Sequence, residues 1–301
     1  MHEVTVFCPG HVTGLFYVPP QPDDLLSQGS LGGGFSIDRG VRTTVSIEGG
    51  EGIEVYIGGT EAEDPQLAVQ TVAAFARAAG GLPEGKVVVR HEPEVPMGAG
   101  LGTSGAAAVG IALGLNVLVG GKLSEEQAYQ VAHKAEILAQ TGLGTVLGLY
   151  AGGCKVSVAM GAPGRGEARA IEVPETIRVV IGVAGPFPTQ EALQNTGVRA
   201  RVEEAGKALH AALAAEPTFE RFLALSREFS RRVDLFSPTV RPLAEACAKE
   251  GIHHAMLMFG DGLYSLVEEA RTPEVEDLYR RLLPGGTTFV CSITGERGKV
   301  V

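Results

Sequence analysis

Short apolar runs rich in β-branched residues mark the predicted strands of this 301-residue chain. In its first half these runs cover residues 4–7, 35–47, 53–57, 86–91, 155–159, 168–173 and 179–183. The first run ends at Cys8-Pro9-Gly10, which predicts a chain reversal. The turn residues 48–50 predict a hairpin between the second and third runs.

Apolar residues three or four positions apart predict helices between and after these strands. Residues 65–79 begin with a proline, residues 103–119 are strongly apolar, and Ser124 with Gln127 forms a capping box for a helix that ends at about residue 139. After Pro188 we expect helices at 199–215, 219–233 and 240–250, strands at 255–259 and 263–267, a helix at 273–282 and a strand at 287–293.

This order of elements predicts the fold class. A strand-rich first half followed by a helix-rich and then mixed second half is typical of an α+β protein with two lobes. The sequence Ala-Gly-Pro-Phe-Pro at residues 184–188 is the expected boundary, which gives one lobe at residues 1–184 and a second at residues 185–301.

Composition and charge narrow the class of protein. With 45% hydrophobic and 20% charged residues the chain can bury a core, and its net charge of −10 disfavours a sequence-independent nucleic-acid binder. The four cysteines are far apart, so we expect buried thiols rather than disulfides or a zinc site. Because the N-terminus lacks a basic segment followed by an apolar run, a cytoplasmic protein is expected.

Residues 98–121 carry no charge and are long enough to cross a membrane. Their start is rich in glycine, and neither a cluster of Lys and Arg nor an aromatic belt flanks them. They therefore predict a loop followed by a buried helix, and no membrane association.

Glycine is unusually frequent, with 42 copies. The glycines gather at residues 29–34, 98–105 and 142–153, which indicates that the backbone approaches something closely there.

The segment PMGAGLGTSGAAA at residues 96–108 leads into the apolar helix. The amides and dipole of a helix N-terminus favour a phosphate, and the hydroxyls of Thr103 and Ser104 stand beside it. A dinucleotide-binding motif also fits the glycine spacing, although no ribose-binding acid follows about 20 residues later. A P-loop would require a lysine that is absent, and a tight loop that only packs against the helix remains an alternative.

The same segment resembles P-x-x-x-G-L-G-S-S-A-A, the phosphate loop of the GHMP kinases. This resemblance implies a two-lobed α+β fold, with an N-terminal lobe like ribosomal protein S5 domain 2 and a C-terminal α/β sandwich-like lobe. It also implies ATP under the loop. The implied ATP-binding residues are Pro96, Gly98, Gly100, Leu101, Gly102, Thr103, Ser104 and Gly105.

Further segments are similar to the archaeal pantoate kinase branch of this family: residues 8–16, 28–41, 141–145 and 151–153. This likeness implies ATP-dependent phosphorylation of pantoate on the way to coenzyme A. Another GHMP small-molecule kinase, a regulatory nucleotide-binding protein of the same fold and, more remotely, a dinucleotide-dependent oxidoreductase are the alternatives. A homodimer is common for such folds.

The resemblance also implies roles for individual residues. Ser104 and Glu136 match the hydroxyl and the helical acid that hold Mg²⁺, and sparse oxygen ligation suits that ion. His133 and Ser30 resemble substrate contacts of the family. His11 is a histidine that follows Pro9-Gly10 in a predicted loop, and such a residue could contact the substrate or a phosphate. Without the resemblance, Glu136 and His133 would be interpreted as exposed helix residues and Ser30 as a turn cap.

Recognition of a carboxylate requires a basic side chain, and Arg39, Arg42 and Lys155 are the candidates. The family places an Arg near Ser157, whereas here only Lys155 is basic, and a lysine cannot form the bidentate clamp of an arginine.

Thr145 completes the expected catalytic set with Ser104 and Glu136, but it stands where many GHMP kinases carry an Asp. Its hydroxyl is too weak a base for that role, although phosphoryl transfer depends mostly on positioning and charge neutralisation. The Met258-Phe259-Gly260-Asp261-Gly262 sequence stands near the place of a late glycine motif, and Asp261 is expected to be a turn residue rather than a substitute acid.

Overall fold

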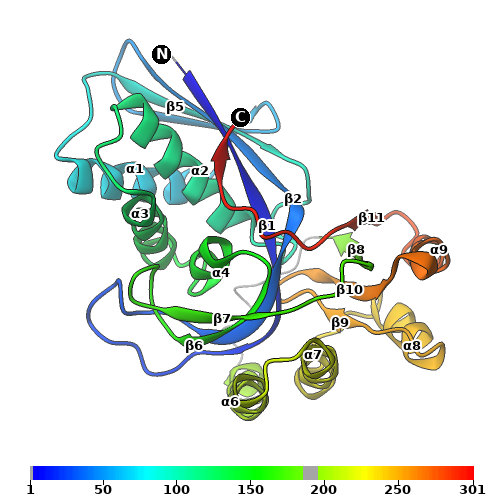
Figure 1. The fold of residues 1–301 in the computed structure, drawn as a ribbon. Coiled ribbons are helices and arrows are strands. Elements are labelled where there is room, and N and C mark those ends of the chain that lie inside the picture. Colours follow the sequence, from blue (N-terminus) through cyan, green and yellow to red (C-terminus); the bar gives the residue numbers. More distant parts are fainter. Residues whose placement is uncertain (1–2, 186–195) are drawn as a thin grey trace.

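The computed structural model describes residues 3–185 and 196–301, and the described chain is built around two β-sheets (Figure 1). The larger sheet has the strand order β12-β1-β2-β5-β3-β4, and β6 joins the N-terminal part of β2 and carries β7. Its strands are β1 Glu3–Tyr17, β2 Leu31–Glu48, β3 Ile53–Ile57, β4 Thr60–Glu61, β5 Lys86–Pro93, β6 Cys154–Ala159, β7 Glu167–Ile171 and β12 Lys299–Val300.

The predicted chain reversal at Cys8-Pro9-Gly10 is wrong, because β1 continues through these residues to Tyr17. A register shift between Pro9 and Gly10 absorbs the proline, which cannot donate a ladder hydrogen bond. On β2, Gly40 lies opposite Pro9, where a side chain would collide with the carbonyl oxygen of Cys8.

The predicted hairpin between β2 and β3 is also wrong. β5 lies between them, antiparallel to β2 and parallel to β3. A parallel pair requires a crossover connection, and the helix α1 (Gln66–Ala79) supplies it between β3 and β5. The local turn signal at residues 48–50 could not reveal this, since pairing with β5 depends on contacts distant in the sequence.

Helices α1, α2 (Thr103–Leu118) and α3 (Glu125–Leu138) pack together against the larger sheet, and their predicted positions are confirmed. The capping box of Ser124 and Gln127 is present at the start of α3. In α2, Gly110 lets the helix approach Thr43 of β2, where an added side-chain carbon would lie 2.5 Å from the threonine Oγ1. Within the described residues no helix is long and apolar enough to cross a membrane.

The smaller sheet has the antiparallel order β11-β8-β10-β9. Its strands are β8 Ile177–Gly185, β9 Ala255–Met256, β10 Asp261–Glu268 and β11 Thr287–Cys291, accompanied by helices α6 Thr196–Ala215, α7 Phe219–Val233, α8 Arg241–Lys249 and α9 Thr272–Leu282 and the short 3-10 helix η1 Glu269–Arg271. The expected lobe boundary at residues 184 and 185 falls at the end of β8, a strand of this second sheet. From β11 the chain returns to the larger sheet and ends as β12 beside β1 (Figure 1).

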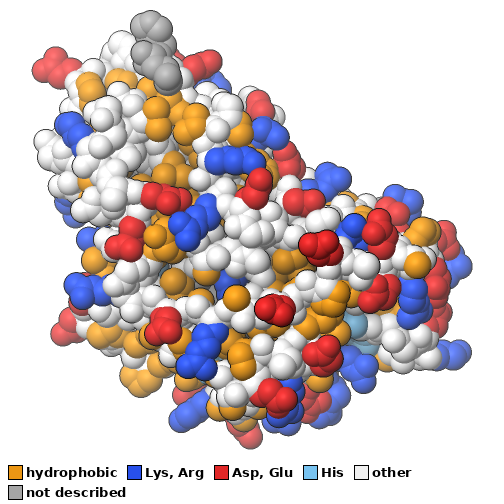
Figure 2. Space-filling view, viewed as in Figure 1, with side chains coloured by type: hydrophobic (Ala, Val, Ile, Leu, Met, Phe, Trp, Pro, Cys, Tyr) orange, Lys and Arg blue, Asp and Glu red, His pale blue; other side chains and the backbone are white. Residues whose placement is uncertain are grey.

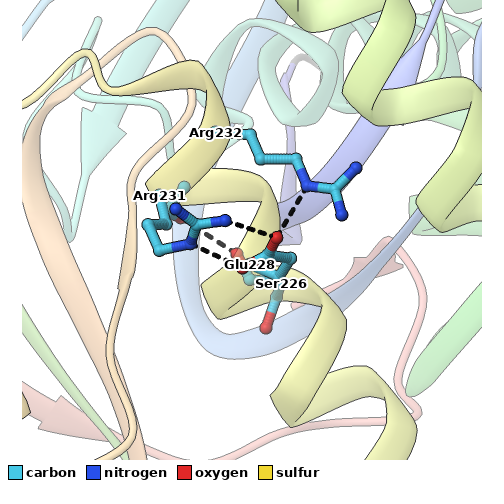
Figure 3. Close-up of polar contacts among 5 residues, drawn as sticks. Ser226, Glu228, Arg231 and Arg232 are labelled. Atoms are coloured by element: carbon cyan, nitrogen blue, oxygen red, sulfur yellow. Dashed lines mark hydrogen bonds and ion pairs between the residues drawn. The ribbon is translucent and has the colours of Figure 1, made fainter.

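Helix α7 shows how the second half combines a buried and an exposed face. Phe222 and Phe229 are fully buried, whereas on the exposed face Glu228 accepts hydrogen bonds from Arg231 and Arg232 (Figure 3). These contacts lower the pKa of Glu228 to about 2. Acidic and basic side chains are interspersed over the face in Figure 2, which shows no large surface of one sign.

Candidate active site

A cavity of about 730 Å³ lies between the larger sheet, the start of α2 and the turn between β9 and β10. The glycine loop before α2 forms one of its walls, with Gly98, Gly100, Gly102, Thr103 and Ser104 among the lining residues. Leu101 also lines the cavity, whereas Pro96 and the buried Gly105 support the loop from outside it.

The N-terminus of α2 is open toward this cavity. Its N-cap residue, Gly102, offers no side chain to cap the first amides, and no acidic residue occupies the first turn. These amides have no partner within the helix, and together with the helix dipole they favour an anionic group. The start of α2 therefore has a geometry that suits a phosphate group.

Gly102 is required at this place for two reasons. Its φ of 67° lies in the left-handed region, and a side-chain carbon there would lie 2.8 Å from Cβ of His11. The backbone N–H of His11 also donates a hydrogen bond of 2.9 Å to the carbonyl oxygen of Leu101. Strand β1 therefore fixes the loop directly.

Ser104 and Glu136 form a polar pair at the mouth of this helix. The Ser104 hydroxyl donates a hydrogen bond of 2.7 Å to Oε1 of Glu136, and Thr141 donates a longer one of 3.4 Å to the same oxygen. Glu136 is 2% exposed, and burial raises its pKa to about 7 against the lowering effect of these hydrogen bonds. Within residues 3–185 and 196–301, no Lys, Arg or His forms an ion pair with this carboxylate.

Two glycines make room for the Glu136 carboxylate. A side-chain carbon at Gly142 would lie 2.7 Å from both of its oxygens, and one at Gly105 would lie 3.2 Å from Oε2. The described residues contain no group of three or more His, Cys, Asp or Glu side chains that could hold a metal ion. Any cation here would therefore be held by few protein ligands.

Thr145 and Ser30 approach the same region. The glycine-rich stretch 142–153 contains the short helix α4 (Thr145–Ala151), and Thr145 in its first turn lines the cavity. A side-chain carbon at Gly105 would lie 2.8 Å from Cγ2 of Thr145, and one at Gly144 would collide with the Ser30 hydroxyl. Ser104, Glu136, Thr145 and Ser30 are thus brought together.

The floor of the cavity is the part of the sheet where β1, β2 and β6 run side by side. Gly34 of β2 lies between Thr13 of β1 and Lys155 of β6, and all three line the cavity. The glycine leaves space above the sheet, while its neighbours supply a hydroxyl and an ammonium group.

Lys155 is a buried cation, 4% exposed, and burial lowers its pKa to about 7. Its Nζ donates hydrogen bonds to the Ser36 hydroxyl, at 3.2 Å, and to the carbonyl oxygen of Gly148 in α4. Within the described parts of the chain no carboxylate lies within 4.0 Å of this nitrogen. A buried cation without a counter-ion is costly, so the site suits an anionic ligand.

His11 lines the cavity beside this lysine and is 7% exposed. Burial, together with the charge of Lys155, lowers the pKa of His11 well below its usual value, so its ring is neutral. Its Nδ1 is buried and has no hydrogen-bond partner among the described residues. The ring is packed against Gly148, where a side-chain carbon would lie 2.9 Å from it.

Three of the residues considered for the substrate, His133, Arg39 and Arg42, do not line the cavity. His133 is buried, and its Nε2 lies 3.1 Å from the carbonyl oxygen of Gln28, in the segment that leads to Ser30. Arg39 is exposed on β2, with its guanidinium 5.8 Å from the centre of the Phe289 ring. Asp261 begins β10 and also lies outside the cavity lining.

Sequence reasoning missed the apolar end of the cavity. Its lining includes Val55, Ile57, Ala62, Asp64, Leu67 and His91. Burial lowers the pKa of His91 to about 4, and its Nδ1 lies 2.9 Å from the Thr43 hydroxyl. The signal that could have found this end is the strand at residues 53–57, but only its parallel pairing with β5 places it beside the phosphate loop.

Comparisons with known proteins agree with this geometry. The family model of the GHMP kinases N terminal domain matches residues 66–153, which include the glycine loop. The pantoate kinase of Thermococcus kodakarensis is 32% identical over 279 residues, which cover 91% of this chain and 91% of that protein. The chain belongs to the GHMP kinase family. The resemblance found in the sequence, to this family and its pantoate kinase branch, is confirmed.

Other relatives extend the agreement for this GHMP kinase family member. The pantoate kinase of Methanocaldococcus jannaschii is 30% identical, with 87% of this chain and 92% of that protein covered. A solved structure described as a phosphotransferase related to the CoA biosynthesis pathway superposes with a TM-score of 0.84 at 29% identity, covering 99% of this chain and 98% of that one. Homoserine kinase from Cytophaga hutchinsonii, at 15% identity, gives a TM-score of 0.74 with 100% and 98% covered, and confirms the two-lobed α+β fold.

Proposed function

We propose that this GHMP kinase family member transfers a phosphoryl group from ATP to pantoate. One observation carries the proposal: one cavity is lined by the open N-terminus of α2, by Ser104, which is hydrogen-bonded to the buried Glu136, and by the buried Lys155. The first suits phosphates, and the last suits the carboxylate of an acceptor. The names of the relatives, all pantoate kinases, support the same reaction.

In this proposal ATP occupies the side of the cavity under the glycine loop. Its phosphates meet the first amides of α2 and the hydroxyls of Thr103 and Ser104. The base extends toward the apolar end formed by Val55, Ile57 and Leu67. Membership of a family of ATP-dependent kinases supports ATP as the donor.

The residues present also fit Mg²⁺. Glu136 is a buried carboxylate with no cationic partner among the described residues, and the Ser104 hydroxyl is already directed at it. Hard oxygen donors in small number, completed by phosphates and water, suit this ion. When bound, Mg²⁺ would neutralise charge on the phosphates, and Ser104 and Glu136 are the residues that would hold it.

Pantoate occupies the floor of the cavity. Lys155 faces its carboxylate, while Ser30, Thr13 and the neutral His11 offer hydrogen bonds to its hydroxyl groups. His133 acts through the backbone of Gln28, because it fixes the segment that carries Ser30. Arg39 is too far to the outside to take part in this arrangement.

The chain's own residues promote transfer chiefly by positioning. The α2 amides orient the phosphates, and the floor holds the acceptor hydroxyl toward them. Thr145 offers a hydroxyl for a hydrogen bond and no carboxylate for proton removal. A phosphoryl transfer of this kind does not depend on a strong base.

The test is ADP formation by the purified protein with MgATP and pantoate, beside homoserine and mevalonate. Turnover with pantoate and loss of turnover in Ser104→Ala support the proposal. Turnover with another alcohol but not with pantoate would mean that the protein is a kinase with a different acceptor.

A second candidate is a nucleotide-binding regulatory protein of the same fold. It is favoured by Thr145, which stands where many GHMP kinases carry an Asp. Such a protein would bind ATP without turnover of any alcohol in the panel. Recovery of turnover in Thr145→Asp would decide for this candidate, since it would show that only the acid is missing. For either function we infer that the protein is a soluble cytoplasmic homodimer.

A further inference from the structure

The turn between β9 and β10, residues 257–260, holds an aromatic residue in the left-handed backbone region. Phe259 has a φ of 60°, which bulky side chains rarely adopt because Cβ then crowds the carbonyl oxygen. The other non-glycine residues with positive φ in the described chain are Gln140 and Asp234, polar residues at helix ends. Such a conformation persists only where the surroundings impose it, and it is common at functional sites.

The surroundings do impose it. Within the turn, Leu257 N–H donates to the carbonyl of Gly262 at 3.0 Å, and Gly260 N–H donates to that of Leu257 at 3.1 Å. A side chain at Gly260 would collide with the carbonyl oxygen of Ala99, and one at Gly100 would collide with that of Met258. The turn and the phosphate loop are thus interlocked through their backbones.

The ring of Phe259 packs edge-on against Phe16 of β1, with the ring centres 5.5 Å apart. Phe16 is held from behind by Phe229, at 6.1 Å. Both Phe16 and Phe259 line the cavity, so the pair presents an apolar surface to whatever occupies it.

The register of the sheet fixes where this surface lies. Phe16 is opposite Gly32 on β2, two residues along the strand from Gly34, which is paired with Lys155. The aromatic pair therefore lies beside the cationic corner at Lys155, and the turn that carries Phe259 also touches the phosphate loop at Gly100.

We propose that Phe259, together with Phe16, is a specificity-determining wall that selects an acceptor with a branched, apolar carbon between its carboxylate and the hydroxyl that receives the phosphoryl group. This inference rests on the proposed function and names a chemical feature of its acceptor. Pantoate has such a carbon, which carries two methyl groups. The linear acid 2,4-dihydroxybutanoate has the same hydroxyls and carboxylate without them.

The expected discrimination follows from apolar burial. One methylene in a hydrophobic pocket changes kcat/KM by about 10- to 200-fold. The wild-type protein should therefore prefer pantoate over the linear acid by at least about tenfold. If the wall makes this difference, its removal should bring the two acids to within a few-fold of each other.

The experiment compares Phe259→Gly and Phe259→Leu with the wild type. Glycine removes the ring and adopts a φ of 60° without strain, so the variant should fold. We expect Phe259→Gly to lose the preference for pantoate and Phe259→Leu, which keeps apolar bulk, to retain part of it. Asp234→Gly is the matched control. It relieves the backbone strain of another left-handed residue, at the end of α7 and outside the cavity lining, and should leave the ratio of kcat/KM for the two acids unchanged.

An unchanged ratio in a Phe259→Gly variant that melts cooperatively overturns the wall. The same holds for an equal fall of kcat/KM with both acids, which would mean that the turn acts only through the phosphate loop. If the wild type forms no ADP with either acid, the proposed reaction fails, and calorimetric binding of the two acids tests the wall by itself. The wall is supported if the wild type binds the branched acid more tightly than the linear acid and Phe259→Gly abolishes this preference. The wall is overturned if the wild type binds the two acids equally or binds neither.

Discussion

Burial governs the carboxyl group of Glu136. It raises the pKa from 4.5 to about 7, so the folded protein holds a proton there that the unfolded chain has released. Between these two values the folded state binds more protons than the unfolded state. The free energy of unfolding should therefore fall as the pH rises from 4.5 to 7, by about 1.4 kcal/mol per pH unit at most.

Glu136→Gln removes this titration. Compared with the wild type, the variant should gain stability progressively from pH 4.5 to pH 7 and keep the gain above it. It should lose kinase activity, because the proposed magnesium site loses its carboxylate. Thermal unfolding across this pH range, without divalent ions, measures the effect. Glu125→Gln, an exposed position on the same helix, is the control and should change stability little. Equal stability of Glu136→Gln and wild type at every pH would contradict the effect of burial.

Burial of Lys155 has the opposite effect on the pH dependence of stability from burial of Glu136. Burial lowers its pKa from 10.5 to about 7, so between these values the unfolded chain binds a proton that the folded protein lacks. Stability should therefore rise with pH through this window, and below pH 7 the buried charge costs its full amount.

Lys155→Met should stabilise the protein at pH 6 to 7, by an amount that shrinks toward pH 10, and raise the KM for pantoate by at least about tenfold because the carboxylate loses its partner. Chemical denaturation and steady-state kinetics measure the two effects. Lys86→Met, which removes a partly exposed ion pair with Glu54 that is not part of the cavity lining, is the control for both. A rise of the KM for ATP alone would assign the lysine to the phosphates instead.

The resemblance of its motifs to those of the GHMP kinases implied most of the residues gathered here. Ser104, Thr145, Ser30, His11 and Lys155 were all expected and line one cavity, and the expected Glu136 is hydrogen-bonded to Ser104. The sequence could not distinguish Lys155 from Arg39 as the buried cation, because burial depends on which face of which strand is covered. It likewise could not show that His133 contacts backbone, or that His91 reaches the other end of the cavity.

At the scale of elements, helix α2 connects fold and chemistry. Its body is buried against β1 and β2, and its uncapped N-terminus opens into the cavity. The left-handed Gly102 provides the sharp entry to the helix beside His11. Changes at this glycine should therefore affect stability and nucleotide binding together.

Gly102→Ala introduces left-handed strain and a collision with His11. The strain alone costs about 1–2 kcal/mol, and the collision should add to it while it displaces the first amides of α2. We expect a lower melting temperature and a loss of ATP affinity by calorimetry. Gly120→Ala, at the other end of α2, has a φ of 83° with no atom within 4 Å of an added side-chain carbon. It should show the strain and bind ATP normally; equal ATP binding by both variants would contradict this role of Gly102.

The bounds of elements with strong local signals were predicted closely, whereas the pairing of strands in the sheets was not. The helices at α2, α3 and α7 carry periodicity, caps or both, and their bounds agree with the structure to within a few residues. The pairing of β3 with β5 and the passage of β1 through Pro9 depend on distant strands, which local patterns do not encode. Helix α4 was missed because its glycines resemble a loop, although Gly148 is needed there to admit His11.

At the scale of the whole molecule, the two sheets meet at the phosphate loop. The turn of the smaller sheet at residues 257–260 touches the loop of the larger one, and the C-terminal segment returns to pair with β1 (Figure 1). On the other side of the floor, the carbonyl of Ser36 accepts a hydrogen bond of 2.9 Å from Thr294 in that segment. The geometry of the cavity therefore depends on residues from both halves of the chain.

Gly260→Ala tests this dependence. An added methyl group would collide with the carbonyl oxygen of Ala99, so the turn and the phosphate loop must separate. Overpacking of this kind costs about 1–3 kcal/mol, and the displaced loop should raise the KM for ATP by about tenfold. Thermal unfolding and initial rates at varied ATP measure both effects.

Gly49→Ala is the matched control, because Gly49 has no atom within 4 Å of an added side-chain carbon and lies outside the cavity lining. It should leave the KM for ATP unchanged. If Gly260→Ala lowers stability but binds ATP as the wild type does, the smaller sheet merely supports the fold. A rise of the KM for ATP in Gly260→Ala alone shows that a residue about 160 positions from the glycine loop sets its geometry, because backbone contact across the two halves leaves no space for one methyl group.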